Sequence, residues 1–151
     1  MLDAPWRGSD ARAGPWAQRT DSREERKRIL LVADDPVVLD RLSVALNRDY
    51  DVVAAVDGIE ALARLETEDF DAVVAELVLP LMDGPLLKRT MDALGRRVPF
   101  IILSSPATIR SVAGDLCGAE QLVKPFDAHQ LASALARAIH ASGRDGRPSP
   151  P

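Results

Sequence analysis

Side chains that bind divalent metals and phosphate stand at the ends of short apolar runs in this sequence. They are two adjacent aspartates, a glutamate, a serine and a lysine: Asp34, Asp35, Glu76, Ser104 and Lys124. Carboxylate oxygens are ligands of hard cations such as Mg²⁺, and hydroxyl and ammonium groups contact phosphoryl oxygens. A fold that brings these five together would form an acidic site for a divalent metal and phosphate.

Three of these residues also have a purely structural explanation. Asp35 precedes Pro36, the order expected of a helix cap followed by proline at the first helical position. Ser104 can satisfy a loop amide, and Lys124 can be a solvated surface charge. The joint placement at the ends of apolar runs is what favours a site.

The elements that must position these residues are predicted from the apolar runs. We expect strands at residues 29–33, 51–55, 72–76, 99–103 and 122–123. Continuous apolar runs of this length are typical of parallel strands that are covered on both faces.

The segments between and after these runs have helical patterns. Helices are predicted after Asp35, from Asp57-Gly58, after Gly84 and Pro85, over residues 106–116 and over residues 127–140. In the second of them, Ile59, Leu62 and Leu65 are expected to face inward. Alternating strands and helices predict an α/β fold with a doubly wound parallel sheet, in which ligands gather beyond the C-terminal ends of the strands.

Composition limits the functional classes. A chain of 151 residues fits one domain, and its single cysteine is compatible with a reducing cytoplasm. Residues 29–140 carry ten Lys and Arg against seventeen Asp and Glu, which argues against nucleic-acid binding. No apolar run approaches the roughly 20 residues that span a bilayer. We therefore expect a cytoplasmic protein that binds neither nucleic acid nor membrane.

The folded domain is predicted at residues 26–141, between a disordered N-terminal tail (1–25) and a second tail (142–151). Pro5-Trp6 and Pro15-Trp16 are each followed closely by arginine. They are either a chance feature of the tail or a short docking motif, since tryptophan anchors interfaces well. The segment after the last helix is too short for a further folded domain, so we expect the domain to stand alone.

Residues 28–140 closely resemble the receiver domain of response regulators in two-component signalling. The resemblance is carried by VLPLMDG at 78–84, with Pro80, Asp83 and Gly84, and by Lys124-Pro125-Phe126. It implies a flavodoxin-like (βα)5 sheet of strand order 2-1-3-4-5 and a cis bond before Pro125. It also implies Mg²⁺ held by the acids, with Ser104 and Lys124 contacting a phosphoryl group.

The departures from the family pattern fall at the same site. Glu76 stands where the family has its phosphoacceptor aspartate. The family has a pair of acids after its first strand, and two alignments with it are possible. Without a gap, Ala33 and Asp34 take the two positions, so Asp34 is the one acid. With a one-residue gap, Asp34 and Asp35 form the pair. Gln121 occupies the position of the aromatic switch residue. We expect Mg²⁺ to bind weakly or not at all.

These features predict a pseudo-receiver that is not phosphorylated at the usual site and acts in a phosphorelay by binding a protein. The partner would be a sensor kinase or a downstream signalling protein. The alternatives are a receiver still phosphorylated by a histidine kinase and a small α/β enzyme that handles phosphate. We expect no enzyme, because the sequence has no glycine-rich phosphate loop and no nucleophile elbow.

Overall fold

Five parallel strands form one sheet in a computed structural model that describes residues 26–107 and 119–145. The strands are β1 (Arg28–Val32), β2 (Asp51–Ala55), β3 (Ala72–Glu76), β4 (Phe100–Ser104) and β5 (Glu120–Val123). Their order across the sheet is β2-β1-β3-β4-β5. The predicted doubly wound α/β fold of strand order 2-1-3-4-5 is therefore confirmed.

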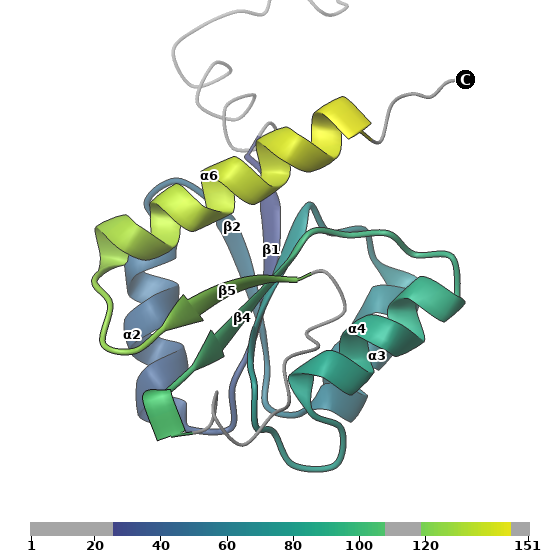
Figure 1. Ribbon diagram of the computed structural model, residues 1–151, viewed down its shortest axis with the longest axis horizontal. Coiled ribbons are helices and arrows are strands. Elements are labelled where there is room, and N and C mark those ends of the chain that lie inside the picture. Colours follow the sequence, from purple (N-terminus) through teal and green to yellow (C-terminus); the bar gives the residue numbers. More distant parts are fainter. Residues whose placement is uncertain (1–25, 108–118, 146–151) are drawn as a thin grey trace, which may run out of the picture.

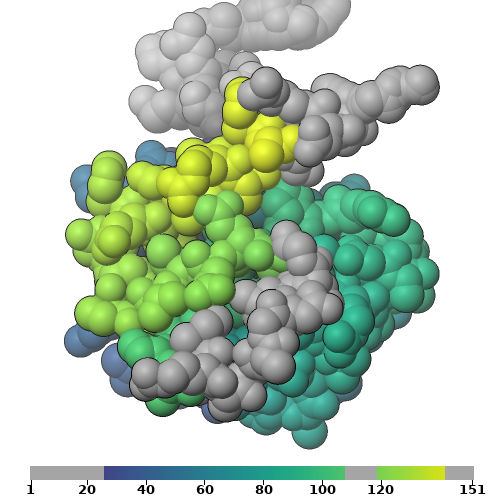
Figure 2. Space-filling view, in the orientation of Figure 1, coloured from purple at the N-terminus to yellow at the C-terminus, as the bar shows by residue number. Residues whose placement is uncertain are grey.

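Helices cover both faces of the sheet (Figure 1). The helices α2 (Pro36–Leu46) and α6 (Ala128–Asp145) contact each other on one face, and α3 (Gly58–Thr67) and α4 (Gly84–Ala93) contact each other on the other. Strands that alternate with helices must cross over in this way, because each parallel strand returns through a helix. In the space-filling view, α6 and β5 lie together on the face toward the reader, beside α4 (Figure 2).

Alternate side chains of each strand enter two separate apolar cores. In β1, Leu30 and Val32 belong to the core beneath α3 and α4, whereas Ile29 and Leu31 belong to the core beneath α2 and α6. Successive side chains of a strand point to opposite faces, so a strand buried on both faces is apolar throughout. This arrangement accounts for the continuous apolar runs in the sequence.

Three helices begin at the C-terminal edge of the sheet behind an aspartate cap. Asp35, Asp57 and Asp83 accept backbone N–H groups from Val37, Glu60 and Leu86, respectively. Pro36 and Pro85 stand at the first turn of α2 and α4, where a missing N–H is tolerated. The caps hold the strand-to-helix loops that surround the predicted site.

Apart from one-residue shifts at the ends of some elements, the structure differs from the sequence predictions in three places. Ile59, expected to face inward, is 49% exposed, because the buried stripe of α3 runs through Gly58, Ala61 and Leu65 instead. That stripe has the i, i+3, i+7 spacing of a helix face, and Ile59 lies one residue off it. The strand predicted at 122–123 begins earlier, at Glu120.

The third difference is that α6 continues to Asp145, beyond the boundary predicted at residue 141. The predicted tail at 1–25 lies outside the described residues. So does the helix predicted at 106–116, except for residues 106 and 107. In the described part of the chain, no helix is long and apolar enough to cross a membrane.

Candidate functional site at the C-terminal edge

The ends of three neighbouring strands bring the predicted phosphate-contact residues to one edge of the sheet. Glu76 closes β3 and is paired in register with Leu103 of β4, and Ser104 is paired with Val123 of β5. The backbone N–H of Lys124 donates to the carbonyl oxygen of Ser104 at 2.7 Å. Glu76, Ser104 and Lys124 therefore end adjacent strands on the same side of the molecule.

Glu76 and Lys124 form a direct ion pair across this edge. The ammonium Nζ of Lys124 donates to Oε1 of Glu76 at 3.0 Å and to Oε2 at 2.9 Å. The Glu76 side chain is 14% exposed and that of Lys124 is 39% exposed. Ion pairs that are partly withdrawn from water are screened less than fully exposed ones, so this contact fixes one negative charge beside the lysine.

The hydroxyl of Ser104 is buried beside this pair without a hydrogen-bond partner. Ser104 is 2% exposed, and its Oγ contacts no donor or acceptor among the described residues. A buried hydroxyl without a partner is unfavourable by about 1–3 kcal/mol. Ser104 is thus held in a position that a bound oxygen would satisfy.

The two acids after β1 do not complete a metal site in this arrangement. Asp35 uses Oδ1 to cap α2 by accepting the Val37 N–H at 2.9 Å, while Asp34 is exposed to solvent. Among the residues that the structure describes, no three His, Cys, Asp or Glu side chains lie close enough to hold an ion. Of the predicted acids, only Glu76 contacts another predicted site residue, and that residue is Lys124.

The loop between β3 and α4 is tightly built around the motif residues predicted from the sequence. The N–H of Gly84 donates to Leu77, and a Cβ at this glycine would lie 2.8 Å from the carbonyl oxygen of Glu76. Asp83 caps α4. Gly84 is therefore required because the loop backbone passes directly against the end of β3.

Two further motif predictions concern the end of β5. The Lys124–Pro125 bond is cis, as the resemblance implied. Gln121 lies in β5 and is exposed. Its side chain is therefore available at the surface, which is where a switch position would act.

Sequence reasoning missed a close contact that joins α3 to the β3–α4 loop. A Cβ at Gly58 would lie 2.1 Å from the carbonyl oxygen of Met82. Asp57-Gly58 was interpreted only as a helix start, although glycine is also typical of positions where two backbones approach closely. No local pattern identifies the partner of such an approach.

Comparison with known proteins agrees with this geometry. Residues 29–136 match the response regulator receiver domain family. Response regulator MprA of Mycobacterium sp. (strain KMS) is 32% identical over 127 residues, which cover 82% of this chain and 55% of the relative. The transcriptional regulatory protein CseB of Streptomyces avermitilis is 35% identical over 133 residues, covering 83% and 56%. The chain thus spans about half the length of these relatives.

Solved receiver domains have the same fold. The receiver domain of a sensor histidine kinase from Pseudomonas aeruginosa PAO1, with magnesium coordinated in its active-site cleft, matches with a TM-score of 0.67. It is 34% identical, and the match covers 76% of this chain and 98% of that one. The chemotaxis protein CheY4 of Vibrio cholerae matches with a TM-score of 0.66 at 26% identity, covering 75% and 98%. The chain described here belongs to the response-regulator receiver family of two-component signalling.

Proposed function

We propose that this chain is a pseudo-receiver, which is not phosphorylated at Glu76 and signals by binding another protein. The observation that carries the proposal is the ion pair between Glu76 and Lys124, at 3.0 and 2.9 Å. By the family resemblance, Lys124 is the residue that would contact a phosphoryl group. Here its ammonium already contacts a permanent carboxylate.

The length of Glu76 supports a loss of phosphotransfer. A phosphoryl group is transferred only when the attacking oxygen is aligned with phosphorus, and an error near 1 Å costs on the order of a hundredfold in rate. Glutamate extends its carboxylate one methylene beyond aspartate, a displacement of about that size. In this chain both carboxylate oxygens accept hydrogen bonds from Lys124, so the ammonium holds the carboxylate in its displaced position.

The same contact supports partial imitation of the phosphorylated state. A carboxylate carries one negative charge, whereas a phosphoryl group carries about −1.5 to −2 at neutral pH. Glu76 therefore supplies part of the charge that would draw Lys124 inward, and it does so without a kinase. The buried hydroxyl of Ser104 has no partner among the described residues, which supports an incomplete imitation.

The acids as arranged do not fit a tightly held Mg²⁺ ion. Asp35 caps α2, Glu76 contacts Lys124, and Asp34 is left as a single exposed carboxylate. Mg²⁺ demands near-ideal octahedral geometry and retains several waters. We expect weak Mg²⁺ binding or none, and no step of the proposed function passes through a metal.

The partner is a protein, either a sensor kinase or a downstream signalling protein. The receiver family is built for such contacts, and the body of this chain is acidic, with ten basic and seventeen acidic residues over 29–140. This charge disfavours direct contact with nucleic acid. The domain thus acts as a binding module and not as an enzyme.

Intact-mass analysis after incubation with acetyl phosphate and Mg²⁺ tests the proposal. The wild-type chain should gain no phosphoryl adduct, because Glu76 is misplaced for attack. The variant Glu76→Asp should gain or greatly raise labelling, and Glu76→Ala is the matched control without an acceptor. A rapidly formed, base-labile adduct on the wild-type chain that Glu76→Ala abolishes would show that Glu76 still accepts phosphate.

Binding measurements test the imitation of phosphate separately. Glu76→Gln keeps the size of the side chain and removes its charge, so it should weaken binding to a partner recovered with the wild-type chain. Arg137→Gln is a suitable control, because Arg137 pairs with Glu120 at the surface, away from Glu76. Equal affinity of Glu76→Gln and the wild type would make the glutamate a structural residue.

A further inference from the structure

Exposed apolar side chains surround the candidate site. Five of the large apolar residues that the structure exposes lie at the C-terminal edge of the sheet: Val37, Val56, Ile59, Val78 and Leu81. We call this set the apolar rim. Val37 lies in the first turn of α2, Val56 and Ile59 flank the cap of α3, and Val78 and Leu81 lie in the β3–α4 loop. Contiguous apolar surface beside polar groups is typical of an interaction site.

Backbone contacts hold the members of the apolar rim near one another. The N–H of Ala33, which follows β1, donates to the carbonyl of Ala55, which ends β2 next to Val56. The start of α3 contacts the β3–α4 loop, where a Cβ at Gly58 would lie 2.1 Å from the Met82 carbonyl oxygen. Gly58 precedes Ile59 and Met82 follows Leu81, so these two apolar side chains project from touching segments.

Leu81 is held outward by an unfavourable turn. Its φ is +72°, and the Met82 N–H donates across it to Pro80 at 2.7 Å, so the three residues form a γ-turn of the rare, strained kind. A bulky residue at positive φ is disfavoured by about 1–3 kcal/mol. The turn leaves Leu81 76% exposed, a placement that an apolar partner would stabilise.

The apolar rim is bordered by acids. Asp34, Asp35 and Asp83 are exposed, and Asp57 is half-buried. The cation at this edge among the described residues, Lys124, is paired with Glu76. A segment that covers the rim should therefore combine large apolar side chains with positive charge.

A segment of this chain outside the described residues has that composition. Residues 5–19 (PWRGSDARAGPWAQR) contain both tryptophans of the protein, with three arginines against one aspartate. The ten residue-to-residue steps from Trp16 to Arg26 can span up to roughly 33–36 Å when extended. Strand β1, which separates the two edges of the sheet, has five residues and so spans only about 17 Å. The segment can therefore reach the apolar rim of its own domain.

We propose that residues 5–19 dock intramolecularly on the apolar rim, with tryptophan against Leu81, Ile59 and their neighbours and arginine beside the aspartates. In this state the segment covers the approach to Glu76 and Lys124 and competes with a protein partner for the same edge. The proposal does not depend on whether Glu76 is phosphorylated.

Tryptophan fluorescence of the full chain tests this inference directly, because both tryptophans lie in the segment. A synthetic peptide of residues 1–25 gives the undocked reference. The full chain should show emission shifted to shorter wavelength and weaker quenching by acrylamide than the peptide. Leu81→Ser combined with Ile59→Ser should move both readouts most of the way back to the peptide values.

Two controls make each outcome decisive. Val44→Ser and Leu94→Ser remove equally exposed apolar side chains elsewhere on α2 and at the end of α4 and should leave the fluorescence unchanged. The shift should also be independent of protein concentration. Emission equal to that of the peptide, or an equal response to the control variants, would overturn the docking site. A shift that appears only at high concentration would instead assign the segment to a second copy of the chain and overturn the intramolecular contact.

Discussion

The two edges of the sheet use charge in opposite ways. At the N-terminal edge, charged side chains form ion pairs and hydrogen bonds with one another. At the C-terminal edge, the described residues place one ion pair beside a buried hydroxyl that has no partner among them, an exposed carboxylate and exposed apolar side chains. The first edge stabilises the domain, whereas the second leaves polar and apolar groups for a ligand or partner.

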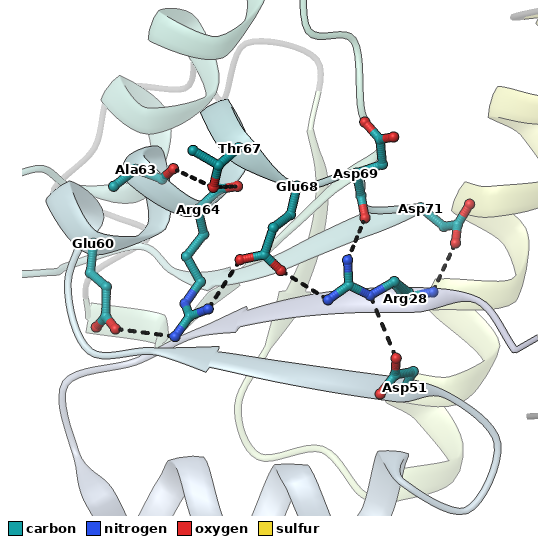
Figure 3. Close-up of polar contacts among 9 residues, drawn as sticks. All are labelled: Arg28, Asp51, Glu60, Ala63, Arg64, Thr67, Glu68, Asp69 and Asp71. Carbon is teal, nitrogen blue, oxygen red and sulfur yellow. Dashed lines mark hydrogen bonds and ion pairs between the residues drawn. The ribbon is translucent and has the colours of Figure 1, made fainter. Parts of the chain in front are cut away.

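Arg28 is the centre of the N-terminal network (Figure 3). Its guanidinium donates to Glu68 at 2.9 Å and to the Asp69 carbonyl at 3.1 Å, and it lies 3.5 Å from Asp51. Its backbone N–H donates to Asp71 at 2.8 Å. These contacts join the starts of β1 and β2 to the end of α3 and the segment before β3.

Arg64 extends the network along α3. It contacts Glu68 at 3.1 Å and Glu60 at 3.9 Å, each four residues away. The hydrogen bond from Arg28 holds the pKa of the Glu68 carboxyl below its ordinary value; burial acts in the opposite direction, and Arg64 adds to the lowering. Arg64 Nε and Ser104 Oγ are both buried without a hydrogen-bond partner among the described residues, so a polar atom without a partner does not identify a site by itself. Ser104 differs because it ends β4 between β3, which carries Glu76, and β5, which Lys124 follows.

The largest effect on stability is expected from Gly58→Ala at the C-terminal edge. A Cβ there would lie against the Met82 carbonyl oxygen. This oxygen belongs to the backbone, so it cannot move aside as the end of a flexible side chain can. We expect a loss of about 2–3 kcal/mol in the free energy of unfolding, measured by urea denaturation. The contact would be dispensable if the variant were as stable as the wild type.

Gly95→Ala is the matched control for that prediction. Gly95 has φ +82° and nothing within 4 Å of its Cβ position, so alanine there introduces backbone strain without a clash. We expect a loss of about 1–2 kcal/mol, smaller than at Gly58. If the two variants lost the same free energy of unfolding, both losses would be due to backbone conformation and not to a clash at Gly58.

At the N-terminal edge, Arg28→Ala should cost about 1–2 kcal/mol of stability. Several hydrogen bonds are lost together with packing of the guanidinium over the Phe70 ring, 4.8 Å from its centroid. Because the Arg28 side chain is 36% exposed, solvent screens part of each interaction. The control Arg137→Ala breaks one surface pair and should cost at most about 0.5 kcal/mol.

The sequence predicted the sheet well and the contacts between its loops poorly. Strands such as 72–76 were predicted at their observed bounds because burial on both faces makes them apolar throughout. Sequence position alone also placed Glu76, Ser104 and Lys124 at one edge, since parallel strands end together. The resemblance to a known family supplied the roles of these residues.

What sequence could not predict depends on side-chain direction and distant partners. Leu65 is buried and Leu62 packs against the core as predicted, but Ile59 faces solvent because the first turn of α3 buries Gly58 and Ala61 instead. Sequence left open whether Asp35 joins the acid set or caps α2, and the structure shows the cap. It placed Lys124 and Glu76 at one edge, but not the hydrogen bonds between these residues, which lie 48 positions apart. These choices are decided by packing among several elements.

Ser104→Ala should have a small effect of opposite sign to Arg28→Ala. The hydroxyl of Ser104 is buried without a partner among the described residues, so its removal takes away an unfavourable burial and no protein hydrogen bond. We expect stability equal to the wild type or higher by up to about 1 kcal/mol. A loss larger than that would mean that the hydroxyl has a partner such as an ordered water.

Glu68→Gln should give the smallest effect and show it only in the pH dependence of stability. A carboxyl whose pKa is lower in the folded state binds its proton more readily when unfolded, so it contributes stability above its unfolded pKa and loses it as pH falls through the folded pKa. The lowered pKa of Glu68 therefore predicts that the wild type is the more stable protein near neutral pH. The two proteins should converge in acid. Urea denaturation midpoints across this range measure the difference, and a gap that persists at the lowest pH would show that the glutamate acts through packing and not through its charge.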